Sequence, residues 1–205
     1  ADVDVASSKL TDVVRLMETV RLGEGVDRTG EFSAAALERT FATCDRYADQ
    51  IRTHGVSKVE FVATSASRDV SNRDEFANGV NSRLGVSPSV ITGEQEAQLS
   101  FAGAVKALGG QIGLEQESVV DIGGGSTEFV RGSVARGVSA AHSVDIGCVR
   151  MTERHLRDDP PSYEQVIAAT ADIDAAIAAA DAQVDFGLAQ TLVGLAGSVT
   201  TVAAL

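Results

Sequence analysis

Hydrophobic positions along the chain follow two spacings, one typical of helices and one typical of strands. Over residues 32–55 the apolar side chains recur every three or four positions, with Ser33 as a cap and Gly55 at the stop, which predicts a long helix. Residues 71–85 form a second such segment, for which Ser71 is the expected N-cap. Further helices are expected over residues 93–110, 148–156, 162–183 and 198–205.

Short runs rich in valine, bounded by glycine or polar residues, predict strands between these helices. They are expected over residues 9–22, 58–66, 89–92, 117–122, 126–131, 138–147 and 191–197. The alternation of strands and helices predicts an α/β fold. Gly109 and Gly110 suggest a boundary between an N-terminal domain of residues 1–112 and a second domain of residues 113–205.

The composition is that of a soluble globular protein, with 44% apolar and 22% charged residues in a chain of 205. No apolar run approaches the roughly 20 residues that span a bilayer, so no membrane partner is expected. The opening residues lack the basic start and apolar stretch of a signal peptide, which favours a cytoplasmic location. Cys44 and Cys148 lie in apolar contexts without a metal-binding spacing, and both are expected in the core.

The formal net charge of −12 disfavours nucleic acid as a partner, because nucleic-acid binders carry a basic face. The charge is also unevenly spread, since seven acidic residues but no Lys or Arg follow Arg157. An anionic substrate would therefore have to be attracted by a few local groups rather than by the field of the whole protein.

Chemistry is first suggested by the stretch VVDIGGGSTEFV, residues 119–130. A strand runs into Gly123, Gly124 and Gly125 and then resumes at once. Consecutive glycines let the backbone turn sharply and point successive N–H groups at one spot, an arrangement that favours anions such as phosphate. A side chain at Gly124 is then expected to block the ligand. The alternative is a tight hairpin that binds nothing.

The residues on either side of these glycines favour the phosphate site over the plain hairpin. Ser126 and Thr127 add hydroxyl donors, and Glu128 follows them. Asp121 comes just before the bend, at the carboxyl end of the strand, where sites form in α/β sheets and where a carboxylate can hold Mg²⁺. The pattern is neither a P-loop nor a dinucleotide fingerprint, because the chain leaves the loop as a strand.

A second glycine turn lies in the stretch GLAGSVTT, residues 194–201. Gly197 and Ser198 are placed where a strand becomes a helix, which suits a phosphate or nucleotide group. Turns of this kind are also common without any ligand, and by itself this one favours the plain turn.

Three charged residues outside the glycine turns are candidates for chemistry. Glu94 and Glu96 follow Gly93 in the first turn of a helix, where acidic residues usually interact with the helix dipole. A carboxylate facing a cleft could instead act as a general base. The two glutamates point about 200° apart around the helix, so only one can face a given site. Arg68 follows a strand and small residues, and its guanidinium either binds phosphate or forms a surface ion pair.

Six stretches together resemble the exopolyphosphatase / guanosine pentaphosphate phosphatase (Ppx/GppA) family of the sugar kinase, actin and heat-shock ATPase superfamily. They are, in chain order, RLGEGVDRTG, FVATSASRD, VITGEQEAQLSF, VVDIGGGSTEFV, SVDIGCVRMTERHL and GLAGSVTTVAAL. The resemblance spans nearly the whole chain and looks most like the short actinobacterial members. It implies two ribonuclease H-like (actin-like ATPase) domains with a cleft between them, and metal-dependent release of terminal phosphate from inorganic polyphosphate.

The resemblance also implies roles for individual residues. Glu96 matches the family's catalytic base, and Arg68 matches an arginine near the attacked phosphate. Asp121 and Glu128 match acidic residues near the metal and the water, so a divalent ion, Mg²⁺ or else Mn²⁺, is the implied cofactor. The loop from Gly123 to Thr127 matches the family's phosphate loop.

One departure concerns the beginning of the chain. Family members open with a strand and a glycine turn of the form D-x-G-[ST]-N-[ST], and this sequence has no such turn. The opening ADVD resembles the end of that strand. The first strand, the first phosphate loop and the C-terminal part of the second domain are therefore expected to be missing, and the fragment alone need not be active.

Three functions remain open at this point. The first is an exopolyphosphatase, in which Glu96 activates a water molecule. The second is a guanosine pentaphosphate 5′-phosphohydrolase, which uses the same chemistry on another leaving group. The third is a nucleotide-binding regulatory protein without turnover, against which Glu96 argues because a pure binder needs no carboxylate facing the phosphate. The expected partner is polyphosphate or a phosphorylated guanine nucleotide, and a homodimer is compatible with the sequence.

Overall fold

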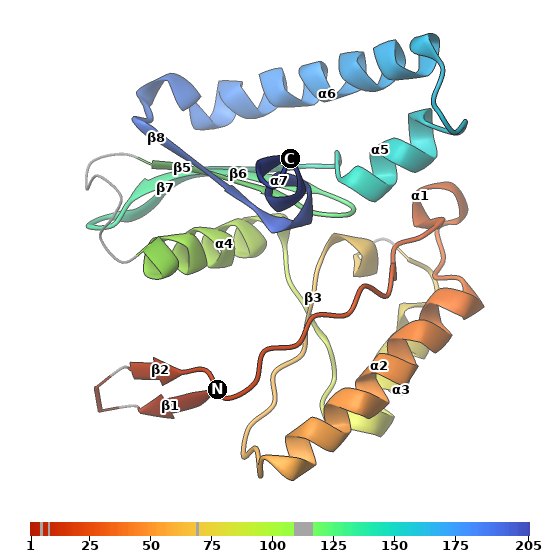
Figure 1. The fold of residues 1–205 in the computed structure, drawn as a ribbon, viewed down its shortest axis with the longest axis vertical. Helices are drawn as coiled ribbons and strands as arrows, with labels where there is room; N and C mark the ends of the chain where they lie inside the picture. Colours follow the sequence, from red (N-terminus) through yellow and green to blue (C-terminus); the bar gives the residue numbers. More distant parts are fainter. Residues whose placement is uncertain (5, 8, 69, 109–116) are drawn as a thin grey trace.

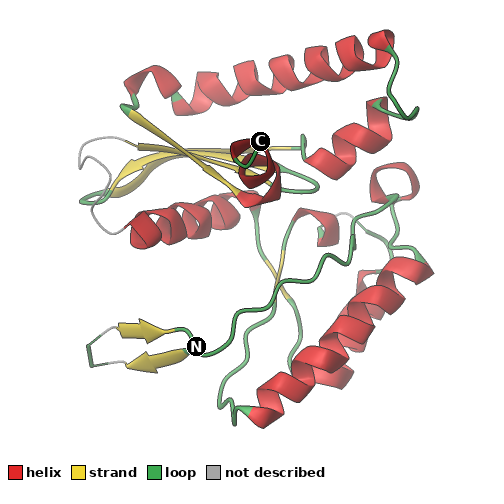
Figure 2. Ribbon diagram, viewed as in Figure 1, coloured by secondary structure: helices red, strands yellow, loops and turns green. Residues whose placement is uncertain are grey.

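A computed structural model describes residues 1–205 with the exception of residues 5, 8, 69 and 109–116. Its elements form two groups that lie one above the other (Figure 1). One group is built around a four-stranded sheet with helices on both faces, and the other contains two packed helices and two small strand pairs (Figure 2). The predicted α/β class is confirmed, whereas the predicted domain boundary after residue 112 lies outside the described residues.

The four-stranded sheet has the order β7-β6-β5-β8. Its strands are β5 (Glu117–Ile122), β6 (Thr127–Ser133), β7 (Gly137–Val144) and β8 (Thr191–Leu195). β6 pairs antiparallel with both β5 and β7, and β8 pairs parallel with β5. α4 (Gly93–Leu108) covers one face and α6 (Tyr163–Val184) covers the other (Figure 1). The carboxyl ends of β5 and β8 therefore meet at one edge of the sheet.

Alternation along the central strands divides the core of this group between the two faces. The cluster on the α4 side consists of Ala97, Phe101, Ala104, Val119 and Val130. The cluster on the α6 side consists of Phe129, Ala180 and Val184. Gly132 sits at a bulge in β6, and a Cβ atom there would lie 2.6 Å from Cζ of Phe101. Phe101 can pack this closely onto the sheet only because that position has no side chain.

The other group has its own core between α2 (Ala34–Thr53) and α3 (Arg73–Leu84). Ser33 caps α2 as predicted, because its side chain accepts a hydrogen bond from the backbone N–H of Ala36. The buried residues of this core are Phe32, Leu37, Cys44, Ala63, Val70, Phe76 and Val80. Phe32 and Phe61 both meet the ring of Phe76 edge to face, which fixes α3 against the segment before α2.

Short strands carry the chain from this core toward the sheet. β3 (Val62–Ala63) and β4 (Ser89–Val90) pair in parallel, which confirms both predicted strands in a shorter form. β3 leads into the 3₁₀ turn η1 (Ser65–Ser67), and β4 leads into α4. The remaining elements are α1 (Val26–Thr29), α5 (Cys148–His155), the turn η2 (Phe186–Leu188) and α7 (Ala196–Ala203).

The predicted strands over residues 9–22 are largely absent. β1 (Asp2–Asp4) and β2 (Lys9–Thr11) pair with each other, and residues 12–21 have no regular structure. A strand exists only when a neighbouring backbone takes up its hydrogen bonds, and among the described residues β1 is the only partner of this segment. The valine and leucine pattern is real, but half or more of the Leu16 and Met17 side chains is exposed.

The expectations for Ser71 as a helix cap and for Cys148 as a core residue are wrong. α3 has Asn72 and not Ser71 as its N-cap, and the Asn72 side chain instead bonds the backbone N–H and C=O of Phe32 at 2.9 and 3.0 Å. Ser71 donates to Glu31 at 2.8 Å. Cys44 is buried as expected, but Cys148 is exposed because it begins α5 at the surface.

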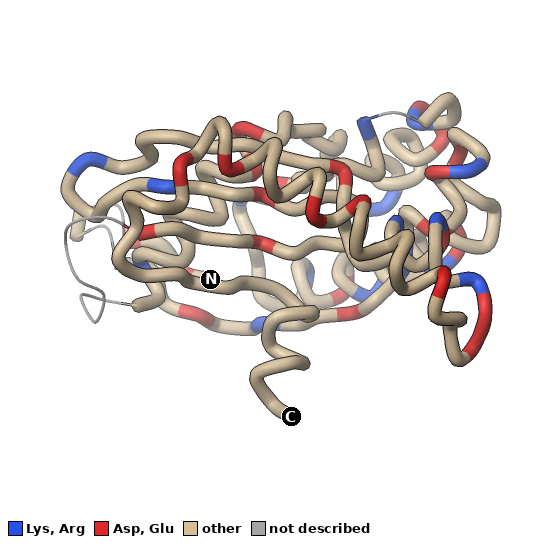
Figure 3. The backbone as a smooth tube through the Cα atoms, turned by 90° about the horizontal axis from the view of Figure 1, so that it is seen from above, with Lys and Arg blue, Asp and Glu red and all other residues tan. Residues whose placement is uncertain are grey.

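Charged positions of both signs are distributed over the molecule. Figure 3 shows acidic segments interleaved with basic ones along the described part of the chain. None of the helices in that part is long and apolar enough to cross a bilayer.

Candidate active site

A row of polar side chains crosses the sheet where β5 ends and β6 begins. Asp121 of β5 lies opposite Glu128 of β6, which lies opposite Ser143 of β7. The hydroxyl of Ser143 donates to Oε1 of Glu128 at 2.7 Å. Asp121 is two residues beyond Val119 and therefore shares its face of the sheet. The alternation that buries Val119 against α4 thus directs two carboxylates toward that helix.

The first turns of α4 lie over this row. Glu96 and Ser100 are one helical turn apart and share a face of the helix. Oγ of Ser100 donates to Oδ2 of Asp121 at 2.5 Å, which ties the helix to the row. At Gly93 a Cβ atom would lie 2.5 Å from Cβ of Ser143, so α4 can begin this close to β7 only with a glycine there.

Arg68 enters from the segment that follows β3. Its Nη2 lies 3.6 Å from Oε2 of Glu96, and the two side chains are only 23% and 17% exposed. The hydroxyl of Thr64, just before η1, also interacts with Glu96. The structure therefore brings together Arg68, Glu96, Asp121 and Glu128. Glu94 is exposed, in keeping with its expected direction away from this cluster.

Burial and mutual repulsion shape the acid–base chemistry of the cluster. Burial raises the pKa of Glu96 to about 7, and the charges of Glu128 and Asp121 act in the same direction against the opposing effect of Arg68. Burial also raises the pKa of Glu128, which is 1% exposed, although the Ser143 hydroxyl opposes the shift. A carboxyl with a pKa near neutrality can accept a proton and release it again, as a general base must.

The glycine loop lies beside this cluster and is held from one side. The backbone N–H groups of Cys148 and Val149, in the first turn of α5, donate to the carbonyl oxygens of Gly123 and Gly124, both at 3.0 Å. The N–H of Gly147 donates to the carbonyl of Gly125 at 3.2 Å. All three glycine carbonyls are thus turned toward α5.

The N–H groups of the loop face the opposite way. In a trans peptide the C=O and the following N–H point in opposite directions, so the N–H groups of Gly124, Gly125 and Ser126 point away from α5. Within the part of the chain that the structure describes, these three groups donate to no acceptor. They form a set of free donors of the kind that binds phosphate oxygens.

The side chains of Ser126 and Thr127 are less available to a ligand than the sequence suggests. The Thr127 hydroxyl donates to the carbonyl of Ile146 at 2.7 Å and is buried. Ser126 is 2% exposed, and its hydroxyl stabilises the ionised form of Glu128. Donation by the loop would therefore come from its backbone more than from its hydroxyls.

The second glycine turn reaches the same edge of the sheet. Leu195, the last residue of β8, lies opposite Asp121, and α7 begins at the next residue. Gly197 is exposed and Ser198 is half-buried. Among the described residues, no hydrogen bond joins these two to the acidic cluster or to the glycine loop, so their phosphate-binding role stays a prediction.

Sequence reasoning missed the small residues that hold the cluster together. Ser100 was detectable, because it stands one turn after Glu96 on the same helical face. Ser143 carries no signal in its own stretch and is placed by strand register alone. Gly147 is as demanding as the three central glycines, since a Cβ atom there would lie 2.2 Å from the backbone C and O of Gly124.

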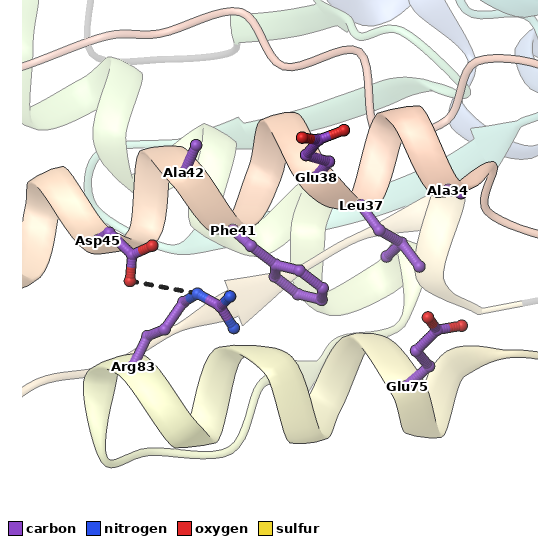
Figure 4. Close-up of a pocket in the computed structure, with 8 residues that line it drawn as sticks. All are labelled: Ala34, Leu37, Glu38, Phe41, Ala42, Asp45, Glu75 and Arg83. Atoms are coloured by element: carbon purple, nitrogen blue, oxygen red, sulfur yellow. Dashed lines mark ion pairs between the residues drawn. The ribbon is translucent and has the colours of Figure 1, made fainter.

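A separate pocket of about 330 Å³ lies between α2 and α3, and its location excludes it as the site of this chemistry. Figure 4 shows its lining, in which Phe41 and Leu37 face the guanidinium of Arg83 and the carboxylate of Glu75. Arg83 pairs with Asp45 at 3.2 Å and stacks over the ring of Phe41. The pocket includes none of the residues of the acidic cluster.

Comparison with known families decides the classification. The sequence profile of the Ppx/GppA phosphatase family matches residues 3–205. The chain belongs to the Ppx/GppA family. It is 46% identical over 206 aligned residues to a protein named exopolyphosphatase 2 from Mycobacterium tuberculosis, covering 98% of this chain and 63% of that protein. The chain thus spans less than two thirds of the curated relatives that it matches.

Solved structures of similar proteins have the same fold. An exopolyphosphatase-like protein is 44% identical with a TM-score of 0.90, covering 94% of this chain and 60% of its own. An exopolyphosphatase from Cytophaga hutchinsonii is 25% identical with a TM-score of 0.87, covering 99% and 64%. The Aquifex aeolicus family member is 31% identical with a TM-score of 0.70, covering 97% and 62%. The fold expected from the Ppx/GppA resemblance is therefore confirmed.

Proposed function

We propose that the protein containing this chain is an exopolyphosphatase, which hydrolyses the terminal phosphoanhydride bond of inorganic polyphosphate. The observation that carries the proposal is Glu96, a carboxyl with a pKa of about 7, set between Arg68 and the pair of Asp121 and Glu128. The name of the M. tuberculosis relative supports polyphosphate as the substrate. The free N–H groups of the glycine loop supply a phosphate-binding surface next to that carboxyl.

Each group has a distinct task in the proposed reaction. The loop N–H groups and Arg68 hold the terminal phosphoryl and take up the charge that develops on its oxygens. Glu96 accepts a proton from water through its carboxylate, whose pKa of about 7 suits a general base. The water oxygen bonds to the terminal phosphorus as the bond to the bridging oxygen breaks. The products are orthophosphate and a chain shorter by one phosphate.

The residues fit a divalent cation that is held jointly with the substrate. Among the described residues no three Asp, Glu, His or Cys side chains converge closely enough to hold a metal by themselves. Mg²⁺ commonly uses one or two carboxylates and completes its shell with water and substrate phosphates. Asp121 and Glu128, whose mutual repulsion a cation would relieve, would hold it. When bound, it would neutralise charge on the phosphate oxygens.

Phosphate release by the whole protein tests the function. Purified protein is incubated with short and long polyphosphate and with guanosine pentaphosphate, in the presence of Mg²⁺ or Mn²⁺, and orthophosphate is measured. Release from polyphosphate that is lost in Glu96→Gln supports the proposal. Release only from guanosine pentaphosphate would assign the other leaving group. Tight nucleotide binding without any release would point to a regulatory protein and overturn the enzymatic proposal.

A further inference from the structure

Arg150 is the one charged side chain in the first turn of α5 that touches the glycine loop. Its Nε donates to the carbonyl oxygen of Gly125 at 2.9 Å, and its backbone N–H donates to the carbonyl of Gly124 at 3.2 Å. The side chain is only 16% exposed. The guanidinium therefore fixes the peptide that joins Gly125 to Ser126, whose N–H is one of the three free donors.

The other end of the guanidinium is held by the opposite half of the molecule. Nη1 of Arg150 pairs with Oδ1 of Asp27, which lies on α1. A second contact fixes the same segment, because both carboxylate oxygens of Glu153 accept from the backbone N–H of Gly25, at 2.9 and 3.1 Å. Residues 25–27 are thus clasped by α5, and the clasp is continuous with the glycine loop through Arg150.

Arg154 provides an internal comparison. It also approaches Asp27, with Nε at 3.4 Å from Oδ2, and it donates to Asp172 of α6 at 2.8 Å. It makes no hydrogen bond to the glycine loop among the described residues. Both arginines therefore share the clasp, but only Arg150 connects the clasp to the loop.

We propose that Arg150, aligned by Asp27, is a positioning residue that sets the direction of the free N–H groups of the glycine loop toward bound phosphate. A planar guanidinium satisfies the Gly125 carbonyl and the Asp27 carboxylate at once through two different nitrogens, whereas a lysine has a single nitrogen at the end of its side chain. Loss of the Arg150 contact leaves the Gly125 carbonyl with one donor, the backbone N–H of Gly147 at 3.2 Å. The direction of that peptide, and with it of the Ser126 N–H, is then held less firmly. The ligand affected is a phosphate chain, so this inference rests on the proposed function.

The test compares Arg150→Gln with the matched control Arg154→Gln in the whole protein. KM and kcat for polyphosphate are measured together with calorimetric binding of tripolyphosphate and amide hydrogen exchange of the peptide that spans residues 123–128. Arg150→Gln is expected to raise KM and weaken tripolyphosphate binding by roughly tenfold or more, because a charged hydrogen bond is lost, with a smaller effect on kcat. Arg154→Gln is expected to change both by less than about threefold.

Two further variants keep the test decisive. Should Arg150→Gln fail to fold, Arg150→Lys retains the charge and is expected to show a partial loss of binding. Asp27→Asn is expected to lose affinity by an amount that does not add to that of Arg150→Gln, since both act through one contact. Binding and hydrogen exchange need no turnover. A wild-type protein that binds tripolyphosphate but releases phosphate from neither short nor long polyphosphate would therefore refute the proposed function and leave the positioning role standing.

The positioning role itself is overturned by any of three results. The first is a folded Arg150→Gln or Arg150→Lys protein with wild-type tripolyphosphate affinity and wild-type exchange in the loop. The second is an equal loss in Arg154→Gln, which would mean that the clasp only supports the fold. The third is wild-type protein whose loop amides gain no protection from tripolyphosphate.

Discussion

Arg68 and Glu96 approach to 3.6 Å between Nη2 and Oε2, although they belong to the two separate groups of elements. Arg68 follows η1, which continues from β3, while Glu96 lies on the helix that covers the sheet. At this distance the ion pair is not a hydrogen bond. The arginine therefore lowers the pKa of Glu96 without cancelling the effect of burial, and its other nitrogens remain available for a phosphate oxygen.

Glu96→Gln in the whole protein should lose most turnover and keep substrate binding. The change is nearly isosteric and removes the ability to accept a proton, which is typically worth about 10²–10⁴-fold in rate. The matched control is Glu94→Gln, because Glu94 is on the same turn but exposed. Phosphate release and tripolyphosphate binding are measured on both. A Glu96→Gln protein that turns over at the wild-type rate, or a Glu94→Gln protein that loses as much, would refute the assignment of the base.

The rate should depend on pH through the same carboxyl. A general base must be ionised, so kcat/KM is expected to fall as the pH drops below the pKa of Glu96, which is about 7 in the absence of metal. A bound cation would lower the pH midpoint of this fall in kcat/KM. The direction in which a mutation shifts the midpoint is therefore a sharper test than its value. The Thr64 hydroxyl favours the ionised form, and Thr64→Val should therefore move the acidic limb to higher pH. An unchanged midpoint in Thr64→Val would exclude Glu96 as the group that titrates.

Glu96 should also destabilise the fold at neutral pH. Its pKa is about 7 in the folded protein against 4.5 for the unperturbed group, so between these values the unfolded chain ionises first. Stability is thus expected to fall as pH rises through this window, by at most roughly 3–4 kcal/mol. In metal-free melting experiments Glu96→Gln should match wild type at pH 4 and melt at higher temperature at pH 8. If wild type and Glu96→Gln melt at the same temperature at pH 8 as well as at pH 4, burial does not raise the pKa of Glu96.

Sequence motifs indicated residues that the structure brings together, but not the residues that only three-dimensional packing places beside them. The roles of the site residues stay predictions. Asp121 and Glu128 flank a glycine run that can be recognised from the sequence alone, and strand alternation puts both side chains on one face of the sheet. Ser143 contacts Glu128 only because β7 pairs with β6 in one register, which its own sequence does not encode. The helices and the Ser33 cap were both predictable, because hydrophobic periodicity and capping depend only on residues close together in the sequence.

The failures in the fold have a common physical origin. Residues 12–21 have the composition of a strand, but strand formation depends on a partner backbone that local sequence does not reveal. The cap of α3 was misassigned by one residue because Asn72 is used for a long-range contact with Phe32 and Ser71 bonds Glu31 instead. In both cases a tertiary contact decided between local alternatives of similar energy.

The two carboxylates of the row should bind Mg²⁺ weakly before substrate arrives, with water in place of the substrate phosphates. A bound cation offsets the cost of burying the Glu128 charge and its repulsion by Asp121, both of which raise the pKa of Glu128. Mg²⁺ is therefore expected to raise the melting temperature of the wild-type protein. Asp121→Asn and Glu128→Gln should each raise the Mg²⁺ concentration needed for this effect on the order of tenfold or more. Glu94→Gln again serves as the control. The metal assignment fails if both variants respond to Mg²⁺ as the wild type does.

The last prediction separates the glycines of the loop. The expectation that a side chain at Gly124 blocks the ligand does not fit the structure, because a Cβ atom there would point toward α5 and meet Cγ2 of Val149 at an ordinary 3.5 Å. The backbone of Gly124 also lies outside the left-handed region, so alanine causes no strain. Gly124→Ala should therefore fold and bind tripolyphosphate like the wild type.

Gly125→Ala should behave differently, because its Cβ atom would lie 2.6 Å from Oγ of Ser65, a residue of η1 that is 7% exposed. The methyl group must displace either η1, which carries the chain to Arg68, or the loop itself. We expect a stability loss of about 1–3 kcal/mol from overpacking and a loss of tripolyphosphate affinity on the order of tenfold to a hundredfold from misplaced groups. Melting and calorimetry on the two variants measure both effects. Wild-type affinity in folded Gly125→Ala, or an equal loss in Gly124→Ala, would mean that the close approach of η1 to the loop does not set the phosphate site.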